Sequence, residues 1–174
     1  MNLRMLPTIR EAEEMVTYTL DQGINMIDTA RVYNGVNASG ETVESEEIVS
    51  RVIAGRTGQE MLVIVTKGHG YNPKAFDEDL STSLRKLQVE KRDGRLYIGT
   101  TEIRLVYFFH GIKEDRWAEI RESGVIEHAK ARQAAGDFTY LGFSAHYGDG
   151  REIKEAIDTG AVQVMELPYN VYNR

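Results

Sequence analysis

The sequence predicts a parallel α/β fold. Short apolar strands alternate along nearly the whole chain with helices, and parallel neighbours need crossover connections of this length. The first strand is a nearly continuous run of apolar residues, as in strands that are covered on both faces. The predicted strands end in polar residues, and parallel α/β folds place their chemistry at the carboxyl ends of strands.

Composition narrows the class of protein. The 174 residues are 41% hydrophobic and 28% charged, which is typical of a soluble globular protein. No apolar run reaches the length of a membrane span and no signal-peptide layout is present, so the sequence predicts no membrane partner and a cytoplasmic location. The chain has no cysteine, which excludes disulfides and thiolate chemistry. Its net charge of −6 is spread along the chain, and nothing indicates a nucleic-acid partner.

The first helix is predicted to begin after Thr8. Thr8 and Glu11 have the spacing of a capping box, in which each side chain binds a free backbone N–H of the first turn. Gly23 is typical of a helix end. The expected buried stripe of this helix consists of Ala12, Met15, Val16, Thr19 and Leu20. A strand over residues 24–30, buried on both faces, should follow.

The middle of the chain continues the alternation. Residues 34–45 are rich in Gly, Asn, Ser and Thr, and we expect a long loop there. Glutamates at 44, 46 and 47 favour a helix start through the helix dipole, and Gly55 ends that helix. A strand over 61–66 then leads to Lys67, and residues 77–87 carry leucines at helical spacing.

The last part of the chain contains the main predicted strand at 104–109, with a short strand before it and two strands after it. Asp93 and Gly94 signal a turn, so residues 95–98 are expected to form a short extra strand before the main strand at 104–109. Helices are predicted at 114–121, 125–135 and 151–158, and strands at 139–143 and 162–167. No linker separates these segments, so the sequence predicts a single domain over residues 1–174.

Polar residues at the strand ends form a candidate site. The carboxyl ends of parallel strands lie at one rim of the sheet, and the residues expected there are Asp28, Lys67, His110, Ser144 and Glu166. Tyr33 should join them from the loop after the first strand. Taken singly, a histidine after an apolar strand is more often structural, and a lysine beside an aspartate is often only an ion pair. Several polar groups on one rim favour an active site.

The residue types indicate proton transfer to a carbonyl oxygen. A phenol has a pKa near 10 and needs a nearby cation before it becomes a useful acid at neutral pH. Lys67 would supply that cation, with Asp28 holding the ammonium in place. His110 would donate a hydrogen bond to a substrate oxygen that becomes negative. Such a set suits protonation of an oxygen while a hydride arrives at its carbon.

At this point a resemblance to a known family emerges. In order, the segments Gly23 to Ala30 with Tyr33, Ser45-Glu46-Glu47, Val65-Thr66-Lys67, Ser83 to Leu87, Tyr107 to His110, Gly142-Phe143-Ser144 and Tyr169-Asn170 with Asn173-Arg174 resemble those of the aldo-keto reductases. The resemblance implies a (β/α)8 barrel of the TIM type, of which about five of the eight strands are recognisable, and NADPH-dependent reduction of an aldehyde or ketone.

The same resemblance implies roles for individual residues. Tyr33 matches the general acid of the family, Lys67 and Asp28 its supporting pair, and His110 its substrate-orienting histidine. A second group would hold the nicotinamide carboxamide, namely Ser144 and Glu166.

The chain also departs from the family pattern. Ala145 stands where the family usually has asparagine, and Glu166 stands in place of a glutamine. The glycine-rich first strand has no clear counterpart in residues 1–6, and strands seven and eight are not recognisable. A partial barrel leaves two open edges, so we expect self-association through them.

Two other functions remain open. The chain could be a catalytically silent, aldo-keto-reductase-like fragment or a regulatory, protein-binding relative. Metal-assisted hydrolysis is the third interpretation, with Asp28, His110, His146 and Glu166 as ligands. Lys67 argues against it, because an ammonium competes with a metal for the same carboxylates, and the sequence predicts no metal site.

Overall fold

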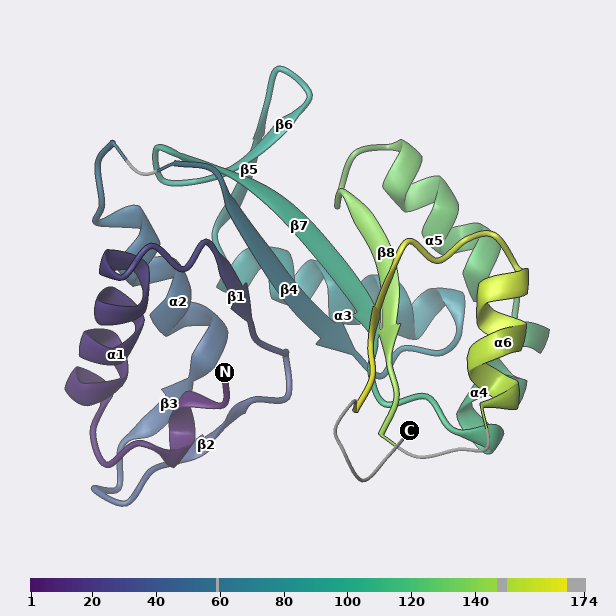
Figure 1. The fold of residues 1–174 in the computed structure, drawn as a ribbon, viewed down its shortest axis with the longest axis horizontal. Helices are drawn as coiled ribbons and strands as arrows, with labels where there is room; N and C mark the ends of the chain where they lie inside the picture. Colours follow the sequence, from purple (N-terminus) through teal and green to yellow (C-terminus); the bar gives the residue numbers. More distant parts are fainter. Residues whose placement is uncertain (59, 147–149, 169–174) are drawn as a thin grey trace.

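A computed structural model describes residues 1–58, 60–146 and 150–168. Five parallel strands form its central sheet in the order β1–β4–β7–β8–β9. They are β1 (Met26–Asp28), β4 (Leu62–Gly68), β7 (Thr101–Phe109), β8 (Tyr140–Ser144) and β9 (Val164–Glu166). The sheet is curved but does not close within the described residues (Figure 1). These five strands confirm the predicted incomplete barrel.

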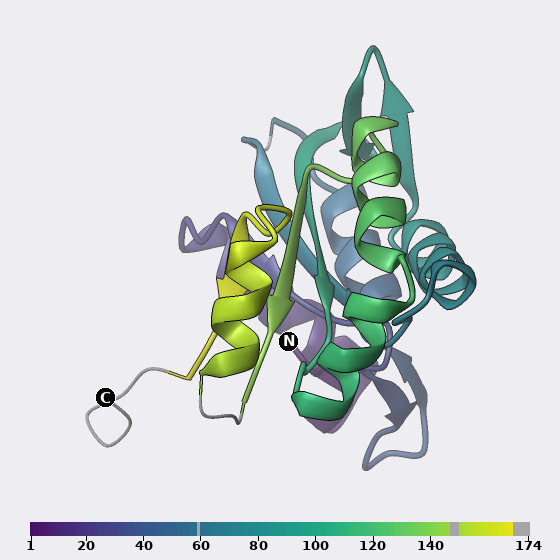
Figure 2. The ribbon, with the colours of Figure 1, turned by 90° about the vertical axis from the view of Figure 1, so that its right-hand side faces the viewer.

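The helices lie outside this sheet. The helical elements are η1 (Leu3–Met5), α1 (Ile9–Asp21), α2 (Ser45–Ala54), α3 (Pro73–Lys86), α4 (Glu114–Glu122), α5 (Val125–Ala134) and α6 (Arg151–Asp158). Helices α1 and α2 lie beside β1, whereas α4, α5 and α6 lie on the side of β8 (Figures 1 and 2). In the part of the chain described here, no helix combines the length and the apolar character needed to cross a membrane.

Apolar side chains form two separate layers. The larger one fills the space between the helices and the sheet and includes Leu62 and Ile64 of β4. The smaller one, on the inner face, consists of Val65, Val106 and Phe108. Successive side chains of a strand point to opposite faces, so Lys67 shares the inner face with Val65. This alternation places the lysine inside the partial barrel, at the carboxyl end of β4.

Helix α1 confirms the predicted capping box. The Thr8 hydroxyl accepts a hydrogen bond from the Glu11 N–H, and the Glu11 carboxylate accepts one from the Thr8 N–H. The predicted buried stripe is correct for Ala12, Val16 and Leu20 but wrong for Met15, which is exposed. A spacing of four residues therefore describes the buried side of this helix.

The prediction that the strand at 24–30 is buried on both faces was wrong. Strand β1 is three residues long, and Ile24 and Met26 are 51% and 50% exposed. Ile27 alone of the strand is fully buried, against the helices. Within the described residues β1 pairs only with β4, so no second parallel strand protects the edge at which Ile24 and Met26 lie.

The expected loop at 34–45 instead contains a hairpin. Strands β2 (Asn34–Val36) and β3 (Thr42–Glu44) pair antiparallel. The Asn37 side chain stabilises the turn, because its carbonyl oxygen accepts hydrogen bonds from the N–H groups of Ser39 and Glu41. Such bonds are the reason that asparagine is common in turns.

The extra strand expected at 95–98 is confirmed. Strands β5 (Val89–Arg92) and β6 (Arg95–Ile98) form a second hairpin, and β6 pairs antiparallel with the start of β7. The turn between them has positive φ angles at Asp93 and Gly94. This hairpin projects beyond the amino ends of the parallel strands (Figure 1).

Helix α3 begins four residues before its predicted start at residue 77. Asn72 is its N-cap, with the side chain accepting a hydrogen bond from the Ala75 N–H, and Pro73 occupies the first helical position. Asparagine followed by proline is a start signal in its own right. The prediction rested on the spacing of the leucines, which begins after this start signal.

Candidate active site

The structure brings the six predicted site residues to one rim. Asp28 is the last residue of β1, Lys67 is the last residue but one of β4, and His110 directly follows β7. The two others at strand ends, Ser144 and Glu166, are register partners in β8 and β9. Tyr33 comes from the loop between β1 and β2. These residues meet because all five strands run in the same direction.

Lys67 is the centre of this group. Its side chain is 1% exposed, and its ammonium forms an ion pair with Asp28. It also donates a hydrogen bond to the Thr29 carbonyl oxygen at 3.1 Å and lies 3.4 Å from the Glu166 carboxylate. A buried charge is tolerated when partners compensate it. Two carboxylates and one carbonyl oxygen do so here.

Tyr33 lies close to both the lysine and the histidine. Its ring centre is 5.5 Å from the Lys67 nitrogen and 5.9 Å from the ring centre of His110, in an edge-to-face arrangement. Burial raises the pKa of Tyr33; Lys67 lowers it by a smaller amount, and Asp28 and Glu166 raise it further. The phenol therefore stays protonated at neutral pH. The sequence predicted that Lys67 supplies a cation for this phenol; the lysine does lower the pKa of Tyr33, but burial outweighs it.

His110 is held as a neutral imidazole. Burial, followed by the repulsion from His69 and Lys67, lowers the pKa of His110 to about 4. Its main chain is fixed at both ends, because its N–H donates to the Gly68 carbonyl and its carbonyl accepts from the Tyr71 hydroxyl at 2.6 Å. The side-chain Nδ1 is buried and has no hydrogen-bond partner among the described residues. A neutral ring can donate one hydrogen bond to a substrate oxygen.

Ser144 and Glu166 are the last residues of β8 and β9, and they continue the rim on those two strands. Ser144 is buried, and its hydroxyl oxygen accepts a hydrogen bond from the Gly111 N–H at 2.9 Å. Glu166 is 48% exposed, and its main-chain carbonyl accepts from the N–H of Ala145. Ala145, at the position where the sequence resemblance implies an asparagine, is itself buried and apolar. The two polar side chains thus offer a hydroxyl and a carboxylate.

Sequence reasoning missed the residues that support this rim. The His69 ring stacks on that of His110, and the main-chain N–H of His69 donates a hydrogen bond to the Asp79 carboxylate at 2.8 Å. The other oxygen of Asp79 lies 2.7 Å from Arg31 Nε, and the main-chain N–H of Arg31 donates a hydrogen bond to the Lys67 carbonyl oxygen. Arg31 lies between Asp28 and Tyr33 in the sequence, and His69 lies two residues after Lys67. Their positions beside predicted site residues were the available signal.

The structure offers no geometry for the metal interpretation. Among the residues that the structure describes, no three histidine, aspartate or glutamate side chains are arranged to hold a metal ion. Lys67 lies between Asp28 and Glu166, two of the four expected ligands. An ammonium in that place competes for both carboxylates.

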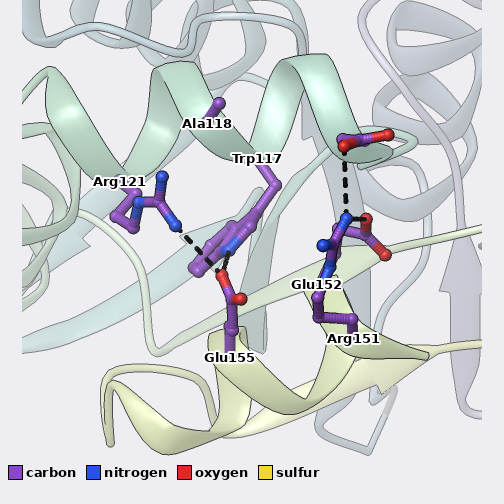
Figure 3. A pocket seen from close by; sticks show the side chains of 7 residues that line it. Trp117, Ala118, Arg121, Arg151, Glu152 and Glu155 are labelled. Carbon is purple, nitrogen blue, oxygen red and sulfur yellow. Dashed lines mark hydrogen bonds and ion pairs between the residues drawn. The ribbon is translucent and has the colours of Figure 1, made fainter. Parts of the chain in front are cut away.

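A cavity of about 160 Å³ lies elsewhere, between α4 and α6 (Figure 3). Its charged side chains pair with one another. Glu155 accepts from the Trp117 indole at 2.7 Å and lies 3.3 Å from Arg121, and Arg151 pairs with Glu114. Since these charges compensate one another on the outer helix layer, the rim of the sheet is the better candidate for an active site.

Comparisons with known proteins agree with this fold. The sequence profile of the aldo/keto reductase family matches residues 7–173. A putative aldo-keto reductase from Pseudomonas aeruginosa has a similar structure, with a TM-score of 0.67 and 22% identity over 98% of this chain and 57% of that one. The holo form of the aldo-keto reductase AKR11C1 from Bacillus halodurans has a TM-score of 0.64 and 23% identity over 93% and 48%.

A third similar structure carries ligands. An aldo/keto reductase from Klebsiella pneumoniae in complex with NADP and acetate has a TM-score of 0.63 and 22% identity, over 92% of this chain and 49% of that one. This chain therefore spans roughly half the length of these similar structures. No curated protein sequence matches it.

Proposed function

The chain belongs to the aldo/keto reductase family, and from this premise we propose that it takes part in reducing the carbonyl group of a small aldehyde or ketone to an alcohol, with NADPH as the hydride donor. The observation that supports the proposal most strongly is the contact of buried Lys67 with Asp28, with the Tyr33 ring 5.5 Å from the lysine nitrogen. A cation beside a phenol stabilises the phenolate that remains after proton donation.

Each residue has a separate task in this reaction. Tyr33 donates its proton to the carbonyl oxygen, and Lys67 stabilises the resulting negative charge. Asp28 keeps the ammonium in place. Neutral His110, whose ring meets that of Tyr33 edge to face, donates a hydrogen bond to the same oxygen and orients it. Preorganised donors of this kind act where charge develops.

Two side chains suit the carboxamide of a nicotinamide cofactor. A primary carboxamide has one acceptor oxygen and two N–H donors. The Ser144 oxygen already accepts from Gly111, which leaves the hydroxyl hydrogen for the carboxamide oxygen. The exposed Glu166 carboxylate accepts an N–H. When bound, NADPH supplies the hydride, which no protein side chain can provide.

The test has a binding arm and a turnover arm. Fluorescence titration should show saturable NADPH binding to the 174-residue chain, with NADH as the comparison. Loss of NADPH absorbance in the presence of a panel of small aldehydes and ketones should then report reduction. Tyr33→Phe should abolish turnover but preserve NADPH affinity, whereas Tyr97→Phe, in the hairpin strand β6, should change neither. Turnover retained by Tyr33→Phe would remove Tyr33 from the acid role.

The alternative of a silent or regulatory relative has its own outcome in this experiment. A folded chain that binds no NADPH and reduces no carbonyl compound would support it.

We also propose that the chain self-associates through its open sheet, because β1 and β9 each pair with only one described strand. Sedimentation across a concentration series should show a dimer or larger species. A strict monomer would contradict self-association.

We also propose that residues 1–174 act as one domain. The parallel strands from β1 to β9 share a single sheet. Limited proteolysis should therefore leave no stable core that is much shorter than the chain, and one cooperative unfolding transition should be seen.

A further inference from the structure

Lys67 has two candidate partners for its last N–H. An ammonium has three N–H donors, and those of Lys67 already serve the Asp28 carboxylate and the Thr29 carbonyl oxygen. Glu166 lies 3.4 Å from the lysine nitrogen. The nitrogen also faces the Tyr33 ring, at 5.5 Å from its centre. The third donor cannot serve both groups equally well.

We propose that Glu166 is a second counter-ion of Lys67 that competes with Tyr33 for the ammonium, so that the lysine assists the tyrosine less while this contact is made. This inference rests on the proposed function, since it concerns the proton donor of that reaction. Glu166 acts on the chemistry only through Lys67, so it is a positioning residue.

The position of Glu166 makes this contact reversible. Asp28 belongs to β1, which pairs directly with β4, and it is the closer of the two carboxylates to Lys67. Glu166 lies on β9 at the far edge of the described sheet and is 48% exposed. Water reaches the Glu166 carboxylate and screens its attraction to the buried lysine, so this pair is weaker than one with both partners buried. A ligand with N–H donors, such as a primary carboxamide, can therefore take the Glu166 carboxylate from Lys67 at little cost.

Charge supports the same conclusion. With Asp28 and Glu166 both ionised, the lysine lies between two negative charges, and each of them opposes the formation of a phenolate at Tyr33. A glutamine at position 166 would keep the size of the side chain but remove one of these charges. The titratable groups around the contact are Asp28, Tyr33, Lys67, His69, His110, His146 and the Met1 amine.

The test measures Tyr33 directly and without cofactor. A fluorinated tyrosine, which titrates at lower pH than tyrosine, is placed at position 33, and its ¹⁹F chemical shift is followed against pH. Glu166→Gln should lower the pKa of this residue by about one unit, the order of effect expected from removing one nearby charge. Glu166→Asp keeps the charge but shortens the side chain by one methylene, and it should give an intermediate value.

The matched control removes a comparable charge elsewhere. Glu127→Gln breaks an ion pair with Lys130 on the exposed side of α5 and should leave the Tyr33 titration unchanged. Circular dichroism and thermal unfolding of each variant verify the fold. A Tyr33 pKa that is the same in wild type and Glu166→Gln would overturn the inference.

This outcome is separate from that of the proposed function. A chain that reduces no carbonyl compound can still show the shift of the Tyr33 titration, which would establish the counter-ion role alone. Conversely, turnover by Tyr33 without any effect of Glu166→Gln on its titration would support the reaction and reject the role of Glu166.

Discussion

The imidazole rings of His69 and His110 lie parallel, 4.6 Å apart between ring centres and inclined by 4°. Two stacked imidazoles at this distance cannot both carry a proton without strong repulsion. Burial and the nearby cations lower the pKa values of both rings, that of His110 to about 4. The pair therefore provides neutral, hydrogen-bonding imidazoles across the physiological pH range.

This relationship predicts a loss of stability in acid. The folded-state pKa of His110 lies below its unfolded value of about 6.5, so the unfolded chain binds a proton that the folded chain rejects. Stability falls as the pH decreases from about 6.5 to about 4. After allowance for solvent screening of a partly exposed ring, we expect a loss of about 1–2 kcal/mol.

The measurement is urea unfolding at about pH 7 and about pH 4.5, below the usual histidine pKa. His110→Gln should lose less stability than the wild type over this interval, because its amide does not titrate. An equal pH dependence in both proteins would show that the ring titrates normally. ¹H–¹⁵N spectra of the two histidines supply the pKa values directly.

Lys67→Met should separate activity from stability. Methionine fills a similar volume beside Phe108, but it leaves Asp28 and Glu166 without their shared counter-ion. Removing one partner of a buried ion pair is destabilising, by about 3–5 kcal/mol when the remaining charge is fully buried. Asp28 stays partly solvated, with 34% of its side chain exposed. Because water reaches both carboxylates, we expect the free energy of unfolding to fall by about 1–3 kcal/mol, whereas carbonyl reduction should fall by about 100-fold or more.

The control for this variant is another lysine with a carboxylate partner. Lys86 pairs with Glu44 at 2.5 Å and is largely buried on the outside of the sheet. Lys86→Met should leave turnover unchanged. Equal losses of activity in the two variants would point to general disruption instead of a role for the Lys67 cation.

The order of strands and helices was predictable because each is a local pattern. The strand that contains Lys67 and the capping box at Thr8 are examples, since a few neighbouring residues specify each of them. The exposure of Ile24 and Met26 was not predictable, because it depends on whether distant strands cover β1. The turn at Asn37 was recognised as polar, yet its hairpin depends on hydrogen bonds that composition does not reveal.

The candidate site shows the same division. Topology placed the ends of parallel strands on one rim, so Asp28 and Lys67 could be predicted together. The net pKa of Tyr33 could not, since it depends on how burial compares with the charge of the lysine. The stacking of His69 on His110 was also not predictable, because it needs the spacing of two neighbouring strand ends.

Thr8→Ala should measure the contribution of the capping box. The substitution removes the acceptor of the Glu11 N–H at the start of α1, and the loss of such a cap costs about 1 kcal/mol. Thr19→Ala is the control, because the Thr19 hydroxyl donates back to the Met15 carbonyl within the helix and alanine favours a helix interior. Urea unfolding should show destabilisation by Thr8→Ala alone; equal effects would reject the cap.

Gly142→Ala should disrupt the inner layer of the sheet. A Cβ at this position of β8 would clash with the Phe108 ring and with the Val164 carbonyl oxygen. The second neighbour is main chain of the paired strand β9 and cannot turn away, so β9 would shift. Overpacking of this kind costs about 1–3 kcal/mol or more.

Gly55→Ala is the matched substitution, since Gly55 ends α2 with a negative φ and its Cβ would meet nothing closer than 3.5 Å. Thermal unfolding should show a clear loss for Gly142→Ala and a neutral or slightly stabilising effect for Gly55→Ala. Because Glu166 follows Val164 on β9, the first variant should also weaken the contact between Glu166 and Lys67, which the ¹⁹F titration at position 33 would detect.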